Sequence, residues 1–287
     1  MNEIEALDAM GGIAPELVNE AGESVRKVKR LPGLLIAAGF CAAVLVCTAV
    51  FAVVKPHKGP GTDAGVSIDA DRKFLYPFFK YEGRIYEGCE AFPNVRDFVG
   101  ETLGTIEHAN IDENFPLEEL EDMTGVAHGE VCAVKGVDPK LMLCMRRGSE
   151  VTVFTCSSGL RLVRGSDVFE DMMHIKEAGK GISYESQASF RVGNNEVYEY
   201  DGDEAYFNAF IDAVCEGEWI PKKEMDRDAY RWWNVYIRLE SGYEAHLVYY
   251  RGGYVKLYGL DGAAVKPDPE RIKPFIEYLD SEHAPDK

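Results

Sequence analysis

The sequence lacks the short signatures of the common catalytic sites. Its 287 residues contain no G-x-S-x-G nucleophile elbow, no H-E-x-x-H zinc motif, no P-loop and no G-x-G-x-x-G dinucleotide motif. Histidine is scarce as well, because the six residues are scattered and none has a sequence neighbour at metal-ligand spacing. We therefore predict that the protein is not an enzyme, and we predict no catalytic, cofactor-binding or metal-binding residue.

Basic residues are also few. The chain has 31 Lys and Arg against 49 Asp and Glu, a formal net charge of −18. Residues 1–54 hold six acidic and four basic residues, which leaves −16 for the rest of the chain. A surface this acidic repels phosphate backbones, so we exclude nucleic acid as an expected partner and keep cations and basic peptides open.

Cysteines are too few, and odd in number, for a complete disulfide framework. Seven are present, and five of them lie beyond residue 54. If Gly136–Lys140 forms a five-residue loop, Cys132 faces Cys144 across a hairpin, which makes one bridge conceivable. We favour buried free thiols, because a domain of this length can bury a core without cross-links. The disulfide state of the two residues stays open at this point.

One feature that the sequence does contain is a long apolar run. Residues Leu31 to Val54 include no charged residue over 24 positions. As a helix the run would reach roughly 36 Å, enough to cross a hydrocarbon core of about 30 Å. Four basic residues precede it within 26–30, and only Lys55 and Lys58 follow closely. We predict a membrane span with a cytoplasmic N-terminus and an extracellular C-terminal domain. A cleaved signal peptide is the alternative, although the run exceeds the usual length of about 7–15 residues.

The segment before the run carries two short apolar stripes, one within residues 4–10 and one within residues 17–21. Helices this short are marginal in water and have nothing of their own to pack against. Their acidic faces disfavour an anionic lipid surface, so a protein groove is the better partner. We predict that a cytoplasmic protein contacts this arm through Ile13, Leu17, Val18 and Ala21.

Beyond residue 72 the sequence alternates short β-type runs with turn signals and a few helical stretches. The stretch Asp203–Cys215 has a helical apolar face, and a last helix is expected after the N-cap Asp268 and Pro269. We predict an α+β extracytoplasmic domain, built from antiparallel meanders plus a few helices, on a single transmembrane helix. The predicted divisions are a cytoplasmic arm (1–30), the span (31–54), a linker (55–72), a first lobe (73–176) and a second lobe (177–287).

Two compositional clusters leave alternatives open. Tyr and Trp residues gather between residues 230 and 258, where a buried sheet is favoured over an exposed face for glycan or peptide. The acidic stretches Asp112–Asp122 and Asp201–Glu204 lack the ligand spacing of an EF-hand, so helix capping and solubility explain them as well as calcium does. Glu244 and His246 share a strand face in the expected register, where we favour a solvated face over a metal site.

A few short stretches of the sequence look familiar, namely Ile13–Ala21, Gly129–Pro139, Ile237–Gly242, Gly252–Val255 and Val265–Lys266. They resemble a group of single-pass membrane proteins of Gram-positive bacteria that are described as anti-sigma-factor-like. The resemblance implies a regulatory membrane protein whose arm contacts a sigma-factor-like partner. The arm contains no His or Cys, which excludes the zinc-binding form of an anti-sigma domain.

Taken together, these features predict a membrane-anchored sensor or regulatory protein of the cell envelope. Its external domain binds an unidentified ligand or partner, residues 31–54 contact the lipid bilayer, and its arm contacts a cytoplasmic protein. A surface module that binds glycan or peptide without signalling is the main alternative. An extracellular hydrolase is less favoured, because no catalytic constellation is visible.

Overall fold

The computed structural model describes residues 65–68, 77–109, 111, 115–194, 196–226 and 229–283. The predicted arm and apolar span therefore lie outside the described residues, as does the predicted linker apart from a short strand, β1 (Val66–Ile68), and its preceding glycine. Within the described part, no helix is long and apolar enough to cross a membrane. All described residues belong to one compact unit, residues 64–287.

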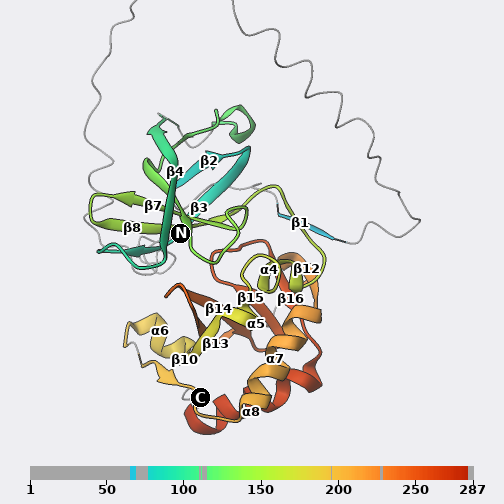
Figure 1. Cartoon of the computed structure of the whole chain (residues 1–287). Helices are drawn as coiled ribbons and strands as arrows, with labels where there is room; N and C mark the ends of the chain where they lie inside the picture. Colours follow the sequence, from blue (N-terminus) through green and yellow to red (C-terminus); the bar gives the residue numbers. More distant parts are fainter. Residues whose placement is uncertain are drawn as a thin grey trace, which may run out of the picture. The chain divides into compact units, whose positions relative to one another are not determined.

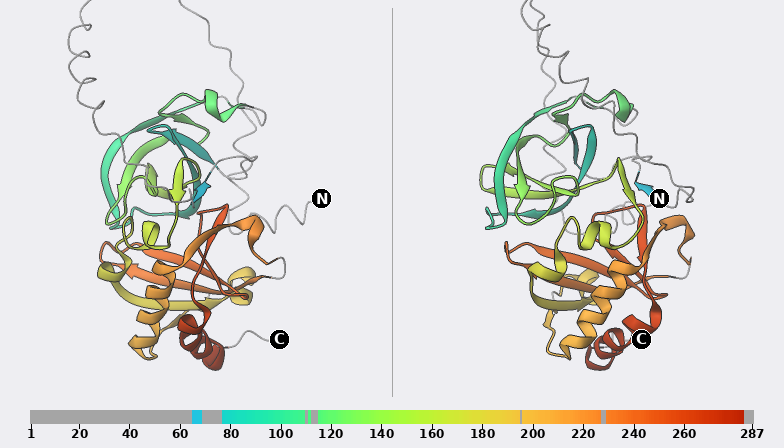
Figure 2. Two further views of the ribbon diagram at one scale, coloured as in Figure 1. Left: turned by 90° about the vertical axis from the view of Figure 1, so that its right-hand side faces the viewer. Right: turned by 45° about the vertical axis from the view of Figure 1, so that its right-hand side comes forward.

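The first element of this unit is a closed barrel of seven strands, drawn in teal to green in Figures 1 and 2. Neighbouring strands are antiparallel except for one parallel pair, β4 and β5. In ring order the strands are β2 (Phe78–Tyr81), β3 (Arg84–Phe92), β8 (Glu150–Cys156), β7 (Met142–Arg147), β6 (Gly129–Val134), β4 (Val99–His108) and β5 (Thr124–Gly125), which pairs again with β2.

Aromatic side chains fill one part of the barrel. The Phe79 ring lies 5.4 Å from that of Tyr86 and 4.9 Å from that of Phe154, and all three residues are buried. Closure depends on a glycine, because a Cβ at Gly125 would lie 2.5 Å from the carbonyl oxygen of Phe78. Only a residue without a side chain allows β5 to approach β2 this closely.

A short connecting region leads from the barrel to a second sheet. Strand β9 (Leu160–Leu162) pairs antiparallel with β1, and helices α4 (Ser166–Phe169) and α5 (Ile175–Ala178) follow. The second sheet has seven antiparallel strands in the order β11 (Tyr198–Glu199), β10 (Gly179–Ser186), β13 (Arg231–Leu239), β14 (Glu244–Tyr250), β15 (Tyr254–Leu257), β16 (Ala263–Lys266) and β12 (Glu218–Pro221).

Two longer helices, α7 (Glu204–Glu216) and α8 (Pro269–His283), pack together and lie against one face of the second sheet (Figure 1). On that face the Trp233 indole donates to Asp280 of α8 at 3.0 Å. The opposite face carries the short helix α6 (Gln187–Val192), whose Phe190 ring lies 5.8 Å from that of His246. Two single-turn 3₁₀ helices, η1 (Leu117–Glu119) and η2 (Lys222–Glu224), complete the described elements.

The helix starts follow from local capping chemistry. The Asp203 carboxylate accepts from the Ala205 amide at 2.8 Å, and the Asp268 carboxylate accepts from the Glu270 amide at 3.0 Å. Each bond satisfies an amide that has no partner within its helix. The predicted start of the last helix after Asp268, with Pro269 as its first residue, is confirmed.

The predicted fold class, an α+β domain of meanders, is wrong. Strands hold 44% of the described residues and helices 23%, and the first meander closes into a barrel. Strands β6, β7 and β8 follow one another as predicted, but β8 also pairs with β3, and β5 joins β4 to β2. These pairings join residues far apart in the chain, so local periodicity carries no trace of them.

The barrel and the second sheet share one cluster of buried residues. The Phe98 ring of the barrel meets the Tyr243 ring of the sheet edge to face, with 5.4 Å between the ring centres. Nearby, Gly259 has a positive φ, and a Cβ there would lie 2.7 Å from both Cys89 Cβ and Thr155 Oγ1. Glycine at this position therefore lets the end of β15 approach the barrel wall closely.

We expect Phe275→Ala to lower the free energy of unfolding by about 3–5 kcal/mol, because the side chain is fully buried. Its ring contacts come from Phe210 of α7, at 4.6 Å, and from Tyr200, at 5.2 Å, whereas the sequence predicted an anchor on the last meander. Urea unfolding measures the change, with Tyr206→Ala as the control on the exposed side of α7. A loss below about 0.5 kcal/mol for Phe275→Ala, the usual size for a surface substitution, would contradict this packing.

Candidate functional site

The predicted partner-binding residues Ile13, Leu17, Val18 and Ala21 lie outside the described residues. The acidic clusters behave as local structure where they are described. Asp203 caps α7, and Asp201 accepts a hydrogen bond from the Tyr278 hydroxyl of α8. Among the described residues, no group of three or more His, Cys, Asp or Glu side chains is arranged to hold a metal ion.

The cysteine pair singled out by the sequence does meet in the barrel. Cys132 of β6 and Cys144 of β7 are direct cross-strand partners, both buried and both free thiols. The Cys144 thiol donates to the carbonyl oxygen of Cys132 at 3.5 Å. Burial raises the pKa of Cys144 to about 12, which keeps its thiol protonated and unreactive near neutral pH.

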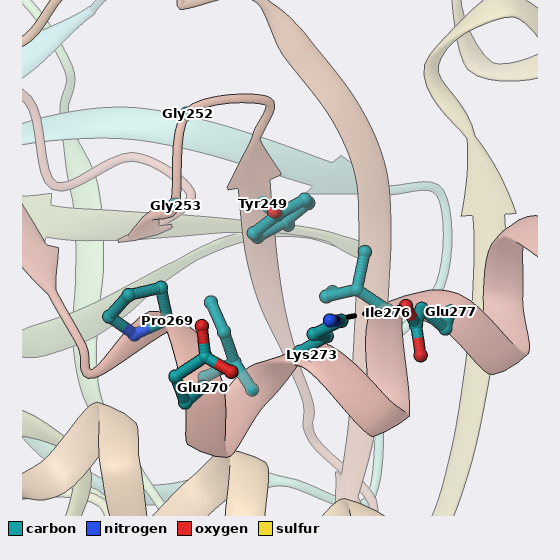
Figure 3. A pocket seen from close by; sticks show the side chains of 9 residues that line it. Tyr249, Gly252, Gly253, Pro269, Glu270, Lys273, Ile276 and Glu277 are labelled. Atoms are coloured by element: carbon teal, nitrogen blue, oxygen red, sulfur yellow. Dashed lines mark ion pairs between the residues drawn. The ribbon is translucent and has the colours of Figure 1, made fainter.

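A groove lies between the β14–β15 turn and the first turns of α8 (Figure 3). Its volume is about 300 Å³, at the lower end of the range of about 300–1,000 Å³ for ligand pockets. Tyr249, Ile272 and Ile276 line its floor, each with less than a tenth of its surface exposed, while Gly252 and Gly253 form one wall. Both glycines have positive φ, so the turn that shapes this wall favours residues without side chains.

The rim of the groove is charged and more negative than positive. Glu270, Lys273 and Glu277 project from α8 along it, and Lys273 pairs with Glu277 at 3.8 Å (Figure 3). Glu270 forms no ion pair with another described residue. The site therefore combines a nearly buried apolar floor with a carboxylate that pairs with no other described residue, which suits a ligand that carries a positive charge.

Three further side chains, none of which lines the groove, contact one another near the start of β13. The guanidinium of Arg251 lies 4.7 Å above the Trp232 ring and donates to the Tyr230 hydroxyl at 3.0 Å. The Trp232 indole donates to Asp280 of α8 at 2.7 Å, so the same helix borders both regions. Tyr230 is 49% exposed, whereas Tyr249 is only 9% exposed. Most aromatic rings of the last meander are thus core residues, as favoured from the sequence.

A second cavity of about 300 Å³ lies on the other side of the same helix start. Charged residues of both signs line it, including Arg164, Lys266 and Arg271. Arg271 is already paired with Glu216, and Arg164 donates to the carbonyl oxygen of Glu216 at 3.0 Å. These contacts join α7 to its neighbours and explain the local charges without a ligand.

The opposite face of the second sheet collects buried polar side chains beneath α6. Glu185 accepts from the Ser189 hydroxyl at 2.8 Å and from the Tyr236 hydroxyl at 3.1 Å. His246 and Asn234 form a bond of 2.9 Å between Nε2 and Oδ1, while the Asn234 amide nitrogen has no partner. The prediction of a solvated face at His246 is wrong, because α6 covers this side of β14.

Stacked rings enclose the His246 imidazole. The Tyr258 ring is parallel to it at 4.4 Å, and the Tyr236 ring lies at 4.7 Å. Burial, together with the positive charges of Arg231 and Lys256, lowers the pKa of His246 to about 3. The imidazole is therefore neutral near pH 7, and it is a poor general acid in this environment.

One carboxylate at the meeting of the barrel and the sheet has an unusual pKa. Loss of surrounding water and the nearby charge of Glu244 raise the pKa of Glu90 to about 7, while Arg96 opposes the shift. The residue as a whole remains exposed, so water screens these charges. Among the described residues, Glu90 belongs to no group of three or more side chains that could hold a metal ion.

Comparisons with known proteins do not identify the site. No protein-family model, no curated protein and no solved structure matches this chain. The sequence analysis also did not predict that the residues of the groove lie close together. Tyr249 and Ile276 were expected in the core, and both are buried there, but nothing local in the sequence shows that the turn at Gly252 faces α8.

We expect the protein to lose stability as the pH falls from about 6.5 towards 3, because His246 takes up a proton more readily when unfolded than when folded. The folded-state pKa is lowered, so the stabilising contribution is complete above the unfolded pKa and disappears below it. A single such group changes the unfolding free energy by at most about 1.4 kcal/mol per pH unit.

Urea titrations across this pH range measure the slope for the wild type, for His246→Gln and for the exposed control His174→Asn. His246→Gln should flatten the slope, and His174→Asn should leave it close to that of the wild type. Equal slopes for all three proteins would contradict a buried neutral imidazole.

Proposed function

We propose that this chain is a sensor or regulatory protein of the cell envelope, and that its folded domain is a non-catalytic binding domain. The observation that carries the proposal is the groove beside α8, where the nearly buried side chains of Tyr249 and Ile276 form an apolar floor below the Glu270 carboxylate, which pairs with no other described residue. The ligand class that fits it best is an extended peptide segment with a basic side chain.

The envelope location rests on the sequence. The uncharged run of residues 31–54 and the four basic residues before it support membrane anchoring with the N-terminus in the cytoplasm. The regulatory role rests on the arm, whose apolar stripe of Leu17, Val18 and Ala21 needs a partner to bury it. A sigma-factor-like partner follows from the resemblance alone.

A peptide suits the groove because the groove residues can contact both the backbone and the side chains of such a ligand. A side chain with an apolar stem can lie against Ile272 and Ile276 while its positive end reaches Glu270 or Glu277. Lys273 lies between the two carboxylates and can bond a backbone carbonyl of the ligand. The net charge of −18 adds long-range attraction for a cationic segment.

Glycan binding is the less favoured alternative. Sugar rings stack on exposed aromatic faces, but Arg251 already covers one face of Trp232, and Tyr249 is only 9% exposed. Tyr230 is the one ring of this region with about half of its surface exposed. A single exposed ring offers too little stacking surface for a sugar chain.

Catalysis by the described residues is also disfavoured on chemical grounds. Burial raises the pKa of Cys89 and Cys144 to about 12 and that of Cys156 and Cys215 to about 11, so these thiols are not nucleophiles at neutral pH. Burial lowers the pKa of His246, the histidine with the best-defined partner. Each of these shifts opposes the charge state that acid–base or nucleophilic catalysis needs.

We expect synthetic peptides with alternating Lys and apolar residues to bind the full chain, and matched Glu-containing peptides to bind much more weakly. The charge-reversed variant Glu270→Lys plus Glu277→Lys should weaken binding of the Lys peptides at least about tenfold, because it replaces both carboxylates of the rim. Fluorescence anisotropy with labelled peptides measures the affinities.

The control is Glu101→Lys plus Glu150→Lys, which makes the same change in net charge at two exposed barrel positions. It should keep most of the affinity if the groove is the site. Equal losses in both double variants would show that the peptides follow overall charge, and absence of binding by the wild type would remove the peptide proposal.

A further inference from the structure

Two histidines that are distant in the sequence meet at the seam of the barrel. His108 is the last residue of β4, and His128 directly precedes β6. Their ring centres are 5.2 Å apart, and their planes make an angle of 65°. No function discussed above uses either residue.

The spacing of the two rings matches that of two imidazoles on one metal ion. A zinc–nitrogen bond of about 2.0–2.1 Å, with the nitrogen about 1.1 Å from the ring centre, places two ring centres about 5.1–5.2 Å apart at the tetrahedral angle. His108 is exposed, so its ring can turn about the Cβ–Cγ bond and direct a nitrogen to the shared point. The backbone therefore already holds the two side chains at chelating distance.

The surroundings of His128 also suit a metal ligand. Its Nδ1 lies 3.4 Å from the carbonyl oxygen of Val126, which favours the tautomer with the proton on Nδ1. That tautomer leaves the lone pair of Nε2 available for a metal ion. Metal-binding histidines commonly donate their second ring nitrogen to a backbone carbonyl in this way.

We propose that His108 and His128 bind one divalent transition-metal ion such as Zn²⁺, with water molecules in the remaining coordination positions. Neutral imidazole prefers zinc, copper and nickel to calcium or magnesium, which take oxygen ligands. The acidic chain raises the local concentration of such cations. Because only two protein ligands are present, the site exchanges its metal more readily than a structural zinc centre.

Metal binding at this position would fasten the barrel seam. The parallel pairing of β4 with β5 ends at His108 and Gly125, three residues before His128. An ion held by both histidines adds a cross-link between β4 and β6 just beyond the end of their antiparallel pairing at Ile106 and Gly129. The proposal is independent of the groove, which lies in the second sheet, so either can fail without the other.

Zinc titration of the tag-free full chain tests the site. We expect one Zn²⁺ per chain and a higher melting temperature in its presence. His108→Asn and His128→Asn should each weaken binding at least about tenfold, since even changes next to a ligand cost 10–100-fold.

His174→Asn is the matched control, because His174 is exposed and has a positive φ that Asn tolerates. It should bind zinc as the wild type does. Circular dichroism of the metal-free variants establishes that they keep the fold. The proposal is overturned if the wild type shows no saturable binding, if all three variants bind equally well, or if only one of the two seam variants loses affinity.

Discussion

The structure depends on the burial of one continuous apolar cluster that belongs to both the barrel and the second sheet. Its junction is the edge-to-face contact of Phe98 with Tyr243, closed on one side by Gly259 against Cys89 and Thr155. Tyr243 is so enclosed that burial raises its pKa well above the ordinary value. Because hydrophobic burial is the main favourable term in folding, neither part can expose its side of this junction without loss of stability.

The two faces of the second sheet position the groove and the His246 side chain. Helix α8 lies on the sheet face that carries Trp233, so the groove forms where its first turns meet the β14–β15 turn. The other face lies beneath α6, where the polar residues bond to one another and His246 is held neutral. Burial on the two sides of this arrangement lowers the pKa of the histidine and raises that of the thiols.

The sequence predicted elements much better than it predicted their assembly. The strands near Cys132, Cys144 and Cys156 and the helix after Asp268 follow from periodicity, turn residues and capping, which are local signals. The closed barrel does not, because it needs β8 beside β3 and a glycine at position 125 that lets β5 reach β2. Likewise, His108 and His128 are brought together where the antiparallel pairing of β4 with β6 ends at Ile106 and Gly129, and His246 is buried by a helix that starts 59 positions earlier in the chain.

The central claim is that the barrel and the second sheet form one cooperative unit. All three tryptophans lie in the sheet, and four of the five described cysteines lie in the barrel, which gives each part its own probe. Tryptophan fluorescence during urea unfolding reports on the sheet, and thiol labelling resolved by mass spectrometry reports on Cys132, Cys144 and Cys156. The account predicts that both signals change at the same urea concentration. Labelling of the barrel thiols at a clearly lower concentration than the fluorescence change would contradict it.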